Sequence, residues 1–545
     1  MDSGRHRSEV VHSEWAVPDQ APAPIGWRHN SGDYLALLLV SMCVMLVHIA
    51  TNGRFGFHRD ELQVLDDARH MAWGFVAYPP VTPLIERIGM ALFDTSLVGL
   101  RLFSVIAQGT VVILAGLIAR ELGARRLAQI VAALAVAVSP IAMFNATEFQ
   151  YTSFDYLWCV LTAYFLVRLL KYQNPRWWLG IGAAVGIGLM TKYTMAFYVA
   201  GILGALLLTS QRRYLKSRWL WYGVALAFLI FLPNLIWQFQ HGLVSLHFLQ
   251  HIHKRDVGEG RANGYWRDQF MINTNPLLAP LWLAGLYYFF FDRDGRRYRM
   301  LGWLWVIPVV VLFVLKGRGY YAAAVYPMLF AAGCVLWDRL VVRARRVGAL
   351  PTAAREAPQS SVGWLGPALV WAVWVVTFAA IALGAYGVGR IVFPLRPISP
   401  SNFALKNNGD LREEIGWKEL VAEVARIRDS LTPAERTHLG IITGNYGETG
   451  AIDLYGRKYG LPQAISGTNT AWYRGYGSPA PQTLIVVGSP RSYVDETFQS
   501  CRLAGHNGNR YGINNEESTD HPDIFVCGPP RKPWPEFWKQ FRFFG

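Results

Sequence analysis

The chain has 545 residues, of which 52% are hydrophobic and only 16% are charged, and its mean hydropathy is above zero. This composition excludes an ordinary soluble enzyme of several domains and predicts a protein that crosses a membrane many times. The formal net charge is +15. The basic residues lie in short clusters between apolar segments, which is typical of signals for membrane orientation and argues against a nucleic-acid partner.

Residues 1–32 are polar, rich in Pro and Ala, and lack the apolar core and cleavage site of a signal peptide, so they predict a disordered cytoplasmic tail. Residues 33–387 form a predicted transmembrane catalytic domain. A bilayer span needs roughly 17–25 apolar residues, and about eleven spans are predicted: 33–51, 98–119, 127–145, 154–171, 177–193, 194–210, 218–237, 275–291, 300–315, 320–337 and 364–387. The two spans within 177–210 are expected to be short helices that meet at a polar turn.

Basic clusters predict the orientation of these spans. With eleven spans, five clusters fall on one side: 120–126, 168–176, 212–218, 293–299 and 339–346. That side is predicted to be cytoplasmic, because positive residues concentrate in cytoplasmic loops. The loops that follow spans one, three and seven, the turn at Lys192, the segment 316–321 and the C-terminal region are then expected to face outward.

The first outer loop contains an unusually polar segment, FGFHRDELQVLDDARHMAWGF, at residues 55–75. Apolar residues recur at helical spacing in this segment, at Leu62, Leu65, Ala68 and Ala72. They predict an amphipathic helix that ends at Gly74. Asp60 lies at the start of this helix, where a carboxylate either caps the helix or performs chemistry. Three residues are expected to face solvent: Asp66, Asp67 and Arg69. The bend at Pro79 and Pro80 precedes a second predicted amphipathic helix, with Leu84, Ile88 and Leu92 on one face.

After about residue 388 the composition changes. Strand-like segments at 440–444 and 483–488 alternate with helix-like segments at 419–431, 449–456 and 493–501, which predicts a small α/β domain outside the membrane over 388–545. Cys501 and Cys527 lie in this domain. A disulfide between them is plausible if the domain faces an oxidising compartment.

Five segments carry a resemblance to a known family: FHRDELQVLDDARHMAWGFVAYPPVTPL (57–84), TEFQYTSFDYLW (147–158), GIGLMTKYT (186–194), KGRGYYAAAVYPML (316–329) and YGETGAIDLYGRKYGLPQAISG (446–467). Together they resemble the polyprenyl-phosphate-sugar-dependent glycosyltransferases of the C-type fold, in particular the bacterial family 39-like enzymes related to protein O-mannosyltransferases and to lipid A aminoarabinose transferase. The resemblance implies a mainly α, polytopic membrane fold with two juxtamembrane helices in the first outer loop.

The resemblance also implies roles for carboxylates. Asp60 would be the general base that activates an acceptor hydroxyl or amine. Glu61 points about 100° away on the same helix and is expected to line the substrate pocket. Asp155 would orient the acceptor or support Asp60, although it could instead cap the helix that follows the second outer loop.

Cations and aromatic rings complete the expected site. Lys192 would pair with the donor phosphate, although it could also reach the interface simply to place its charge in water. Arg59, Lys316 and Arg318 are further phosphate candidates. Tyr320 and Tyr321 either line the sugar or lipid pocket or belong to the interfacial aromatic belt.

Metal binding is left open. In the aminoarabinose branch, an acidic and a basic residue precede the Pro pair, whereas this chain has Ala77 and Tyr78 there. This departure argues against a metal site of that kind and against that activity. His247 and His251 share a helical face and are weak candidates for a divalent metal. No other cofactor is expected.

These features predict a glycosyltransferase of the bacterial inner membrane with an active site that faces the periplasm or the outside. It would move mannose or another single sugar from a polyprenyl-phosphate donor to an acceptor glycan, lipid or protein. Direct displacement with inversion at the anomeric carbon is implied by the resemblance. A transporter or flippase of a glycan or lipid-linked sugar is the alternative. The charged residues gather in outer loops rather than at mid-membrane, which disfavours that alternative.

Overall fold

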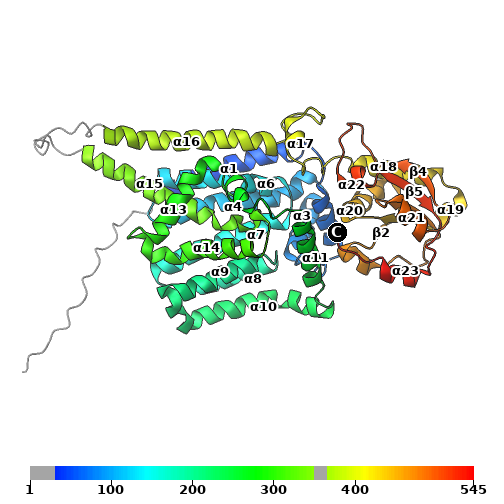
Figure 1. Cartoon of the computed structure of the whole chain (residues 1–545), viewed down its shortest axis with the longest axis horizontal. Helices are drawn as coiled ribbons and strands as arrows, with labels where there is room; N and C mark the ends of the chain where they lie inside the picture. Colours follow the sequence, from blue (N-terminus) through cyan, green and yellow to red (C-terminus); the bar gives the residue numbers. More distant parts are fainter. Residues whose placement is uncertain (1–30, 349–364) are drawn as a thin grey trace, which may run out of the picture.

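The computed structural model describes residues 31–348 and 365–545. The predicted tail at 1–32 lies almost wholly outside the described residues. A bundle of long helices makes up most of the structure, and an α/β part lies at one end of the bundle (Figure 1). The chain therefore passes through the bundle first and builds the α/β part last.

The bundle contains six described helical segments that are long and apolar enough to cross a membrane: α1 (Ser31–Thr51), α4 (Leu97–Glu121), α7 (Tyr151–Tyr172), α10 (Arg218–Gln240), Gly295–Val314, which holds η3 (Gly295–Tyr298) and α14 (Arg299–Val314), and Trp371–Val392 of α16 (Leu365–Val392). Such helices satisfy their backbone hydrogen bonds internally, as a bilayer requires. The chain is therefore a multi-pass membrane protein.

Three bent helix pairs raise the number of spans in the described chain to nine if each pair is one span: α5 (Arg126–Ala137) with α6 (Pro140–Thr147), α9 (Met195–Leu208) with η1 (Ser210–Lys216), and η4 (Gly319–Val325) with α15 (Pro327–Gly348). Two shorter apolar segments remain, α8 (Trp177–Leu189) and Pro276–Phe290, which holds η2 (Pro276–Leu278) and α13 (Ala279–Phe290). Each predicted span overlaps one of these segments, and the total of eleven crossings stays a prediction.

The five basic clusters are joined by contacts at one end of the bundle. These contacts link Arg125 with Asp338, Lys171 with Glu121, Arg297 with the Leu170 carbonyl, Arg213 with Gln173, and Arg339 with Asp292. The α/β part lies beyond the other end of the bundle (Figure 1). The clusters therefore share one side, as the spacing of the apolar segments predicts.

Two helices occupy the first outer loop, α2 (Arg59–Arg69) and α3 (Val81–Phe93). The predicted helix stop at Gly74 is wrong, because α2 already ends at Arg69. The following residues leave the helix to contact α10: the Asn234 side chain donates to the Trp73 carbonyl at 3.0 Å, and a Cβ on Gly74 would lie 2.4 Å from the Trp237 ring. The apolar face of α3 points outward, with Leu84, Ile88 and Leu92 exposed.

The α/β part holds a five-stranded sheet of order β2-β1-β3-β5-β4. The strands are β1 (Leu439–Thr443), β2 (Ala464–Ser466), β3 (Thr483–Val487), β4 (Arg502–His506) and β5 (Asp523–Cys527). β1 is parallel to β2 and β3, whereas β5 is antiparallel to β3 and β4. Cys501 and Cys527 form a disulfide that links the residue before β4 to the end of β5.

The bundle loops contain two more helices, α11 (Val244–Gly258) and α12 (Tyr265–Met271). The chain after the bundle contains the helices α17 (Phe403–Asn407), α18 (Trp417–Ser430), α19 (Pro433–Thr437), α20 (Tyr446–Tyr455), η6 (Gly456–Tyr459), η7 (Asn469–Arg474), α21 (Arg491–Thr497), α22 (Glu516–Asp520) and α23 (Trp534–Gln540). Leu62 and Leu65 of α2 share one apolar core with Trp417 and Leu420 of α18. The first outer loop is thus packed into the α/β part.

Two glycines allow α20 to approach α2 closely. A Cβ on Gly450 would lie 2.4 Å from the carbonyl oxygen of Leu62, and a Cβ on Gly447 would lie 2.9 Å from the Cβ of Arg59. Both distances are too short for a side chain, so the spacing of the two glycines in YGETG fits a close helix crossing. This crossing brings Tyr446 next to the start of α2.

The substitution Gly450→Ala is expected to destabilise this crossing, because the added methyl group meets backbone atoms that cannot rotate away. Overpacking of this kind typically costs about 1–3 kcal/mol. Thermal unfolding of the purified protein in detergent should show a lower Tm. Gly508→Ala is the matched control, since a Cβ there would meet nothing within 4 Å. Equal Tm shifts in the two variants would contradict the close approach.

Candidate active site

Asp60 lies at the second position of α2 with its carboxylate not used as a cap. The cap is His58, whose Nδ1 accepts from the backbone N–H of Asp60 at 3.2 Å. Oδ1 of Asp60 accepts a hydrogen bond from the Tyr446 hydroxyl at 2.9 Å, while its Oδ2 accepts none from the described residues. The positive end of the helix dipole favours the ionised carboxylate at this position. Asp60 therefore has one oxygen held in place and one available to accept a proton.

Glu61 does not line a pocket, in contrast to the expectation from the sequence. It is 1% exposed, and its two oxygens accept from Arg101 Nε at 2.8 Å and Nη2 at 2.6 Å. The backbone N–H groups of His58 and Phe149 also donate to this carboxylate at 2.8 and 2.7 Å. Both oxygens of Glu61 are occupied by these contacts, because the helix turns its side chain toward α4 and away from Asp60.

Glu148 is a further buried carboxylate near the start of α2, and it was not among the site residues predicted from the sequence. It lies directly after α6, and its Oε2 is 3.9 Å from Nδ1 of His58, the residue that caps the helix of Asp60. Burial raises the pKa of Glu148 well above its ordinary value, and the charges of Asp410, Glu61 and Asp60 add to this effect. Glu148 lies in the motif TEFQ of the second outer loop, where the resemblance implies an acidic residue. Asp155 was the predicted acidic residue of that loop.

Lys192 lies in the turn between α8 and α9, among three tyrosine rings. Its Nζ is 5.0 Å from the ring centre of Tyr151, 5.5 Å from that of Tyr320 and 4.8 Å from that of Tyr321. Such ring faces stabilise a cation. No hydrogen-bond or ion-pair partner is seen for this ammonium group in the described part of the chain, so it can bind an anion.

Tyr151 is one of the three tyrosines around Lys192, and it also lies near Asp60. It is the first residue of α7, and the charges of Asp60 and Arg318 both act on its hydroxyl. Its ring therefore contacts the ammonium group of Lys192, and its hydroxyl lies within the electrostatic influence of Asp60. Tyr151 and Tyr446 were not among the residues predicted from the sequence, because a tyrosine at the start of a helix carries no distinctive signal.

Asp155 does not cap α7, since the capping position is occupied by Gln150. Its Oδ2 accepts from the Thr194 hydroxyl at 2.8 Å, and Thr194 follows the turn that holds Lys192. The charge of Asp155 acts directly on Lys192. The structure thus brings Asp155 to the cation rather than to Asp60.

The other three cations predicted to bind the donor phosphate differ in whether they already have an ion-pair partner. Arg318 forms a two-pronged pair with Asp256, with both N–O distances at 2.6 Å. Arg59 pairs with Glu516 at 2.5 Å. Lys316 is exposed and has no side-chain partner among the described residues. The charge of Arg318 acts on the hydroxyl of Tyr321, one of the three tyrosines around Lys192.

His247 and His251 are exposed on α11. His251 contacts the ring of Phe544, with ring centres 5.8 Å apart. Within residues 31–348 and 365–545, no group of three or more His, Cys, Asp and Glu side chains has the arrangement of a metal site. The two histidines therefore remain a weak candidate with no carboxylate partner beside them.

Asp66 and Asp67 do not face solvent, so that expectation is wrong. They are 4% and 2% exposed and both pair with Arg474 of the α/β part, while the Tyr78 hydroxyl donates to Asp67 at 2.7 Å. Burial raises the pKa of Asp67 to about 7, although Arg474 acts to lower it. These carboxylates attach α2 to the α/β part.

Comparison with known proteins agrees with this arrangement. Residues 77–237 match the family described as dolichyl-phosphate-mannose-protein mannosyltransferase. The lipid A galacturonosyltransferase RgtD of Rhizobium johnstonii is 27% identical over 347 residues, and the alignment spans 62% of this chain and only 60% of the relative.

The solved structure of ArnT from Cupriavidus metallidurans in the apo state has a TM-score of 0.52 at 14% identity, with 91% of this chain and 98% of ArnT covered. This likeness concerns the fold. The resemblance predicted from the loop motifs is confirmed: the chain is a multi-pass membrane protein related to the C-type-fold glycosyltransferases that include the protein O-mannosyltransferases.

Proposed function

We propose that the protein is a glycosyltransferase that moves a single sugar from a polyprenyl-phosphate donor to an acceptor at the outer membrane surface. The observation that carries this proposal is that Tyr151 lies near both a carboxylate, Asp60, whose charge acts on its hydroxyl, and an ammonium group, Lys192, whose Nζ is 5.0 Å from its ring centre. The name of the matched family, which includes a dolichyl-phosphate sugar, supports the class of donor. The name of RgtD, a lipid A enzyme, supports an acceptor at the membrane.

In the proposed reaction, Oδ2 of Asp60 accepts the proton of an acceptor hydroxyl or amine as that atom attacks the anomeric carbon. A new bond forms between the acceptor atom and the sugar, and the bond between the sugar and the phosphate oxygen breaks. The electron pair leaves with the polyprenyl phosphate, and the proton stays on Asp60. Tyr446 holds Oδ1, so the other oxygen is directed toward the acceptor.

Lys192 would hold the donor phosphate. Its ammonium group has aromatic faces around it and no ion-pair partner within 4.0 Å among the described residues, so it can pair with the phosphate and would stabilise the negative charge that develops there. Asp155 and Thr194 would fix the turn that carries Lys192. Tyr320 and Tyr321 would pack against the sugar or the first isoprene units.

The same geometry supports a division of the chain into two domains. The catalytic part would be residues 33–387 with eleven crossings, and 388–545 would be an extracytoplasmic α/β domain. Asp60, Lys192 and the α/β part lie away from the basic loops, which supports an active site on the periplasmic face of a bacterial inner membrane. Mannose or another hexose or pentose, and a glycan, lipid or protein acceptor, all fit this proposal.

Purified protein supplied with labelled polyprenyl-phosphate sugars and acceptor-containing membranes tests the proposed function. Transfer of label to a membrane lipid, glycan or protein is the expected result. Absence of transfer with every hexosyl and pentosyl donor, together with passage of the labelled lipid across sealed vesicles, would favour the flippase alternative and overturn the proposal.

The substitution Lys192→Ala is expected to weaken the binding of polyprenyl phosphate by about tenfold or more, because a charge-assisted hydrogen bond contributes roughly 1.5–3 kcal/mol. Titration of the purified protein with polyprenyl phosphate measures the Kd. Lys254→Ala is the control, since Lys254 is an exposed lysine of α11. An unchanged Kd in Lys192→Ala would refute the phosphate role of this lysine.

A further inference from the structure

A cavity of about 520 Å³ lies between the juxtamembrane helices and the α/β part, away from Asp60. It is lined by Arg69 and His70 at the end of α2, by Arg87 of α3 and by Arg457 of η6, together with apolar residues such as Met90. Arg69 is nine residues from Asp60 along α2, which corresponds to about 13 Å at 1.5 Å per residue. The cavity is therefore distinct from the candidate active site.

The three arginines of this cavity lack ion-pair partners. Within the described chain, no carboxylate oxygen lies within 4.0 Å of their guanidinium nitrogens. Arg69 donates only to the Asp453 carbonyl at 3.0 Å, and Arg87 only to the Ala68 carbonyl at 3.4 Å. The Nε of Arg69 is buried without any partner. Buried donors of this kind are costly unless a ligand satisfies them.

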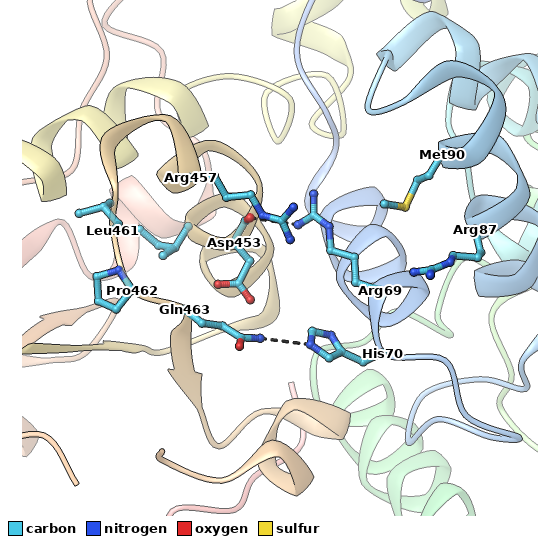
Figure 2. A pocket seen from close by; sticks show the side chains of 10 residues that line it. Arg69, His70, Arg87, Met90, Asp453, Arg457, Leu461, Pro462 and Gln463 are labelled. Atoms are coloured by element: carbon cyan, nitrogen blue, oxygen red, sulfur yellow. Dashed lines mark hydrogen bonds between the residues drawn. The ribbon is translucent and has the colours of Figure 1, made fainter. Parts of the chain in front are cut away.

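Like charges face one another in this cavity. Figure 2 shows the guanidinium groups of Arg69 and Arg457 directed toward each other, with Arg87 on the other side of Arg69. Burial and the charge of Arg457 both lower the pKa of Arg69. Asp453 also lines the cavity and its charge acts on Arg69, but this one carboxylate faces three arginines and its Oδ1 accepts from the Ala464 N–H at 2.8 Å. The cavity therefore has an excess of positive charge that an anion would neutralise.

The position of the cavity indicates where the anion comes from. Arg87 and Met90 belong to α3, and the outward face of the same helix exposes Leu84, Ile88 and Leu92. A helix with an exposed apolar face and a basic side lies in the membrane interface, at the depth of lipid headgroups. A phosphate attached to acyl chains can reach the arginines from the membrane while its chains contact the apolar face of α3.

We propose that this cavity is a second lipid site, in which Arg69, Arg87 and Arg457 bind the phosphate of a membrane-lipid headgroup. Guanidinium groups bind phosphate in a two-pronged manner, and two of them can hold one phosphate from opposite sides. His70 also lines the cavity, and its ring is held in place because Nε2 accepts from the Gln463 amide at 3.2 Å (Figure 2) and Nδ1 donates to the Asp66 carbonyl at 3.0 Å. The bound lipid would lie one helix length from Asp60.

The test uses the purified full-length protein in a neutral detergent and native mass spectrometry with three probes: dioleoyl phosphatidic acid, dioleoylglycerol and inorganic phosphate. Phosphatidic acid is expected to bind, and Arg457→Gln and Arg87→Gln are each expected to weaken it by about tenfold. Arg502→Gln is the matched control, because Arg502 is a half-exposed arginine of the α/β part. Its affinity for phosphatidic acid should equal that of the unaltered protein.

The outcomes separate the sources of the anion. Equal affinity of Arg457→Gln, Arg87→Gln and the unaltered protein for phosphatidic acid would overturn the site. Binding of inorganic phosphate as tight as that of phosphatidic acid would overturn the lipid source, and binding of dioleoylglycerol with the same dependence on Arg457 would overturn the phosphate. Asp60→Asn should bind phosphatidic acid normally, so a failure of the proposed transfer reaction leaves this result unaffected. Unchanged Tm values for the variants exclude misfolding.

Discussion

Asp60→Asn is expected to lower the rate of sugar transfer by about 10²–10⁴-fold, which is the usual contribution of a general base. The asparagine keeps an oxygen that can accept from the Tyr446 hydroxyl, which lies 2.9 Å from Oδ1 of Asp60. The substitution therefore removes the proton acceptor with little change in shape. The measurement is single-turnover transfer from a labelled polyprenyl-phosphate sugar.

The kinetic pattern distinguishes a base from a structural residue. Loss of a base lowers kcat and leaves the affinity for the donor unchanged, whereas loss of structure lowers both and lowers Tm. Asp94→Asn is the matched control, because Asp94 is an exposed carboxylate directly after α3 and the substitution makes the same chemical change away from Asp60. Turnover in Asp60→Asn equal to that of the control would remove Asp60 as the base.

The local pattern of apolar residues predicts the helices and strands, including α2, the helix that carries Asp60. Apolar stretches located every span-sized helix of the described bundle, and the 3.6-residue period located α2 and α3. The end of α2 was predicted one turn too late, because the signal at Gly74 is local whereas the cause is contact with Asn234 of α10. Helix ends depend on tertiary contacts that a periodic pattern does not contain.

The carboxylates of the first outer loop show even more clearly that a sequence pattern does not contain tertiary contacts. Asp66 and Asp67 have the composition of a solvated helix face, but their partner, Arg474, is about 400 residues further along the chain. Glu61 and Asp60 are adjacent, yet one is buried against Arg101 and the other faces Tyr446. Sequence identified which residues are charged, whereas partners far away in the chain determine which of them are available for chemistry.

Arg101 occupies the centre of the contacts that hold the first outer loop. Besides its bonds to Glu61, its Nη2 donates to Glu414 at 3.0 Å and its Nη1 donates to the carbonyl of Asn52 at 2.8 Å. It is 2% exposed, and Glu61 and Glu414 are 1% and 4% exposed. Burial raises the pKa of Glu414 to about 8 even though Arg101 acts to lower it. Two buried carboxylates thus depend on one guanidinium group.

Arg101→Met is therefore expected to destabilise the protein by about 3–5 kcal/mol, the usual effect of removing one partner from a buried ion pair. The methionine nearly fills the space of the arginine chain but leaves two carboxylates without a cation. Thermal unfolding in detergent should show a large fall in Tm, together with loss of transfer, because α2 carries Asp60. Arg426→Met is the control, since Arg426 forms an exposed pair with Glu423, and exposed pairs contribute little.

A triple variant, Arg101→Met with Glu61→Gln and Glu414→Gln, separates the effect of charge from that of packing. If unpaired buried charge is the cause, removal of both carboxylates should recover much of the lost Tm, since a buried polar network without net charge costs less than an orphaned ion. If the triple variant unfolds at the same temperature as Arg101→Met, the guanidinium group acts through its hydrogen bonds to Asn52 and Gly56 instead. The position of Asp60 would then depend on the backbone that precedes α2 rather than on the ion pair of Glu61.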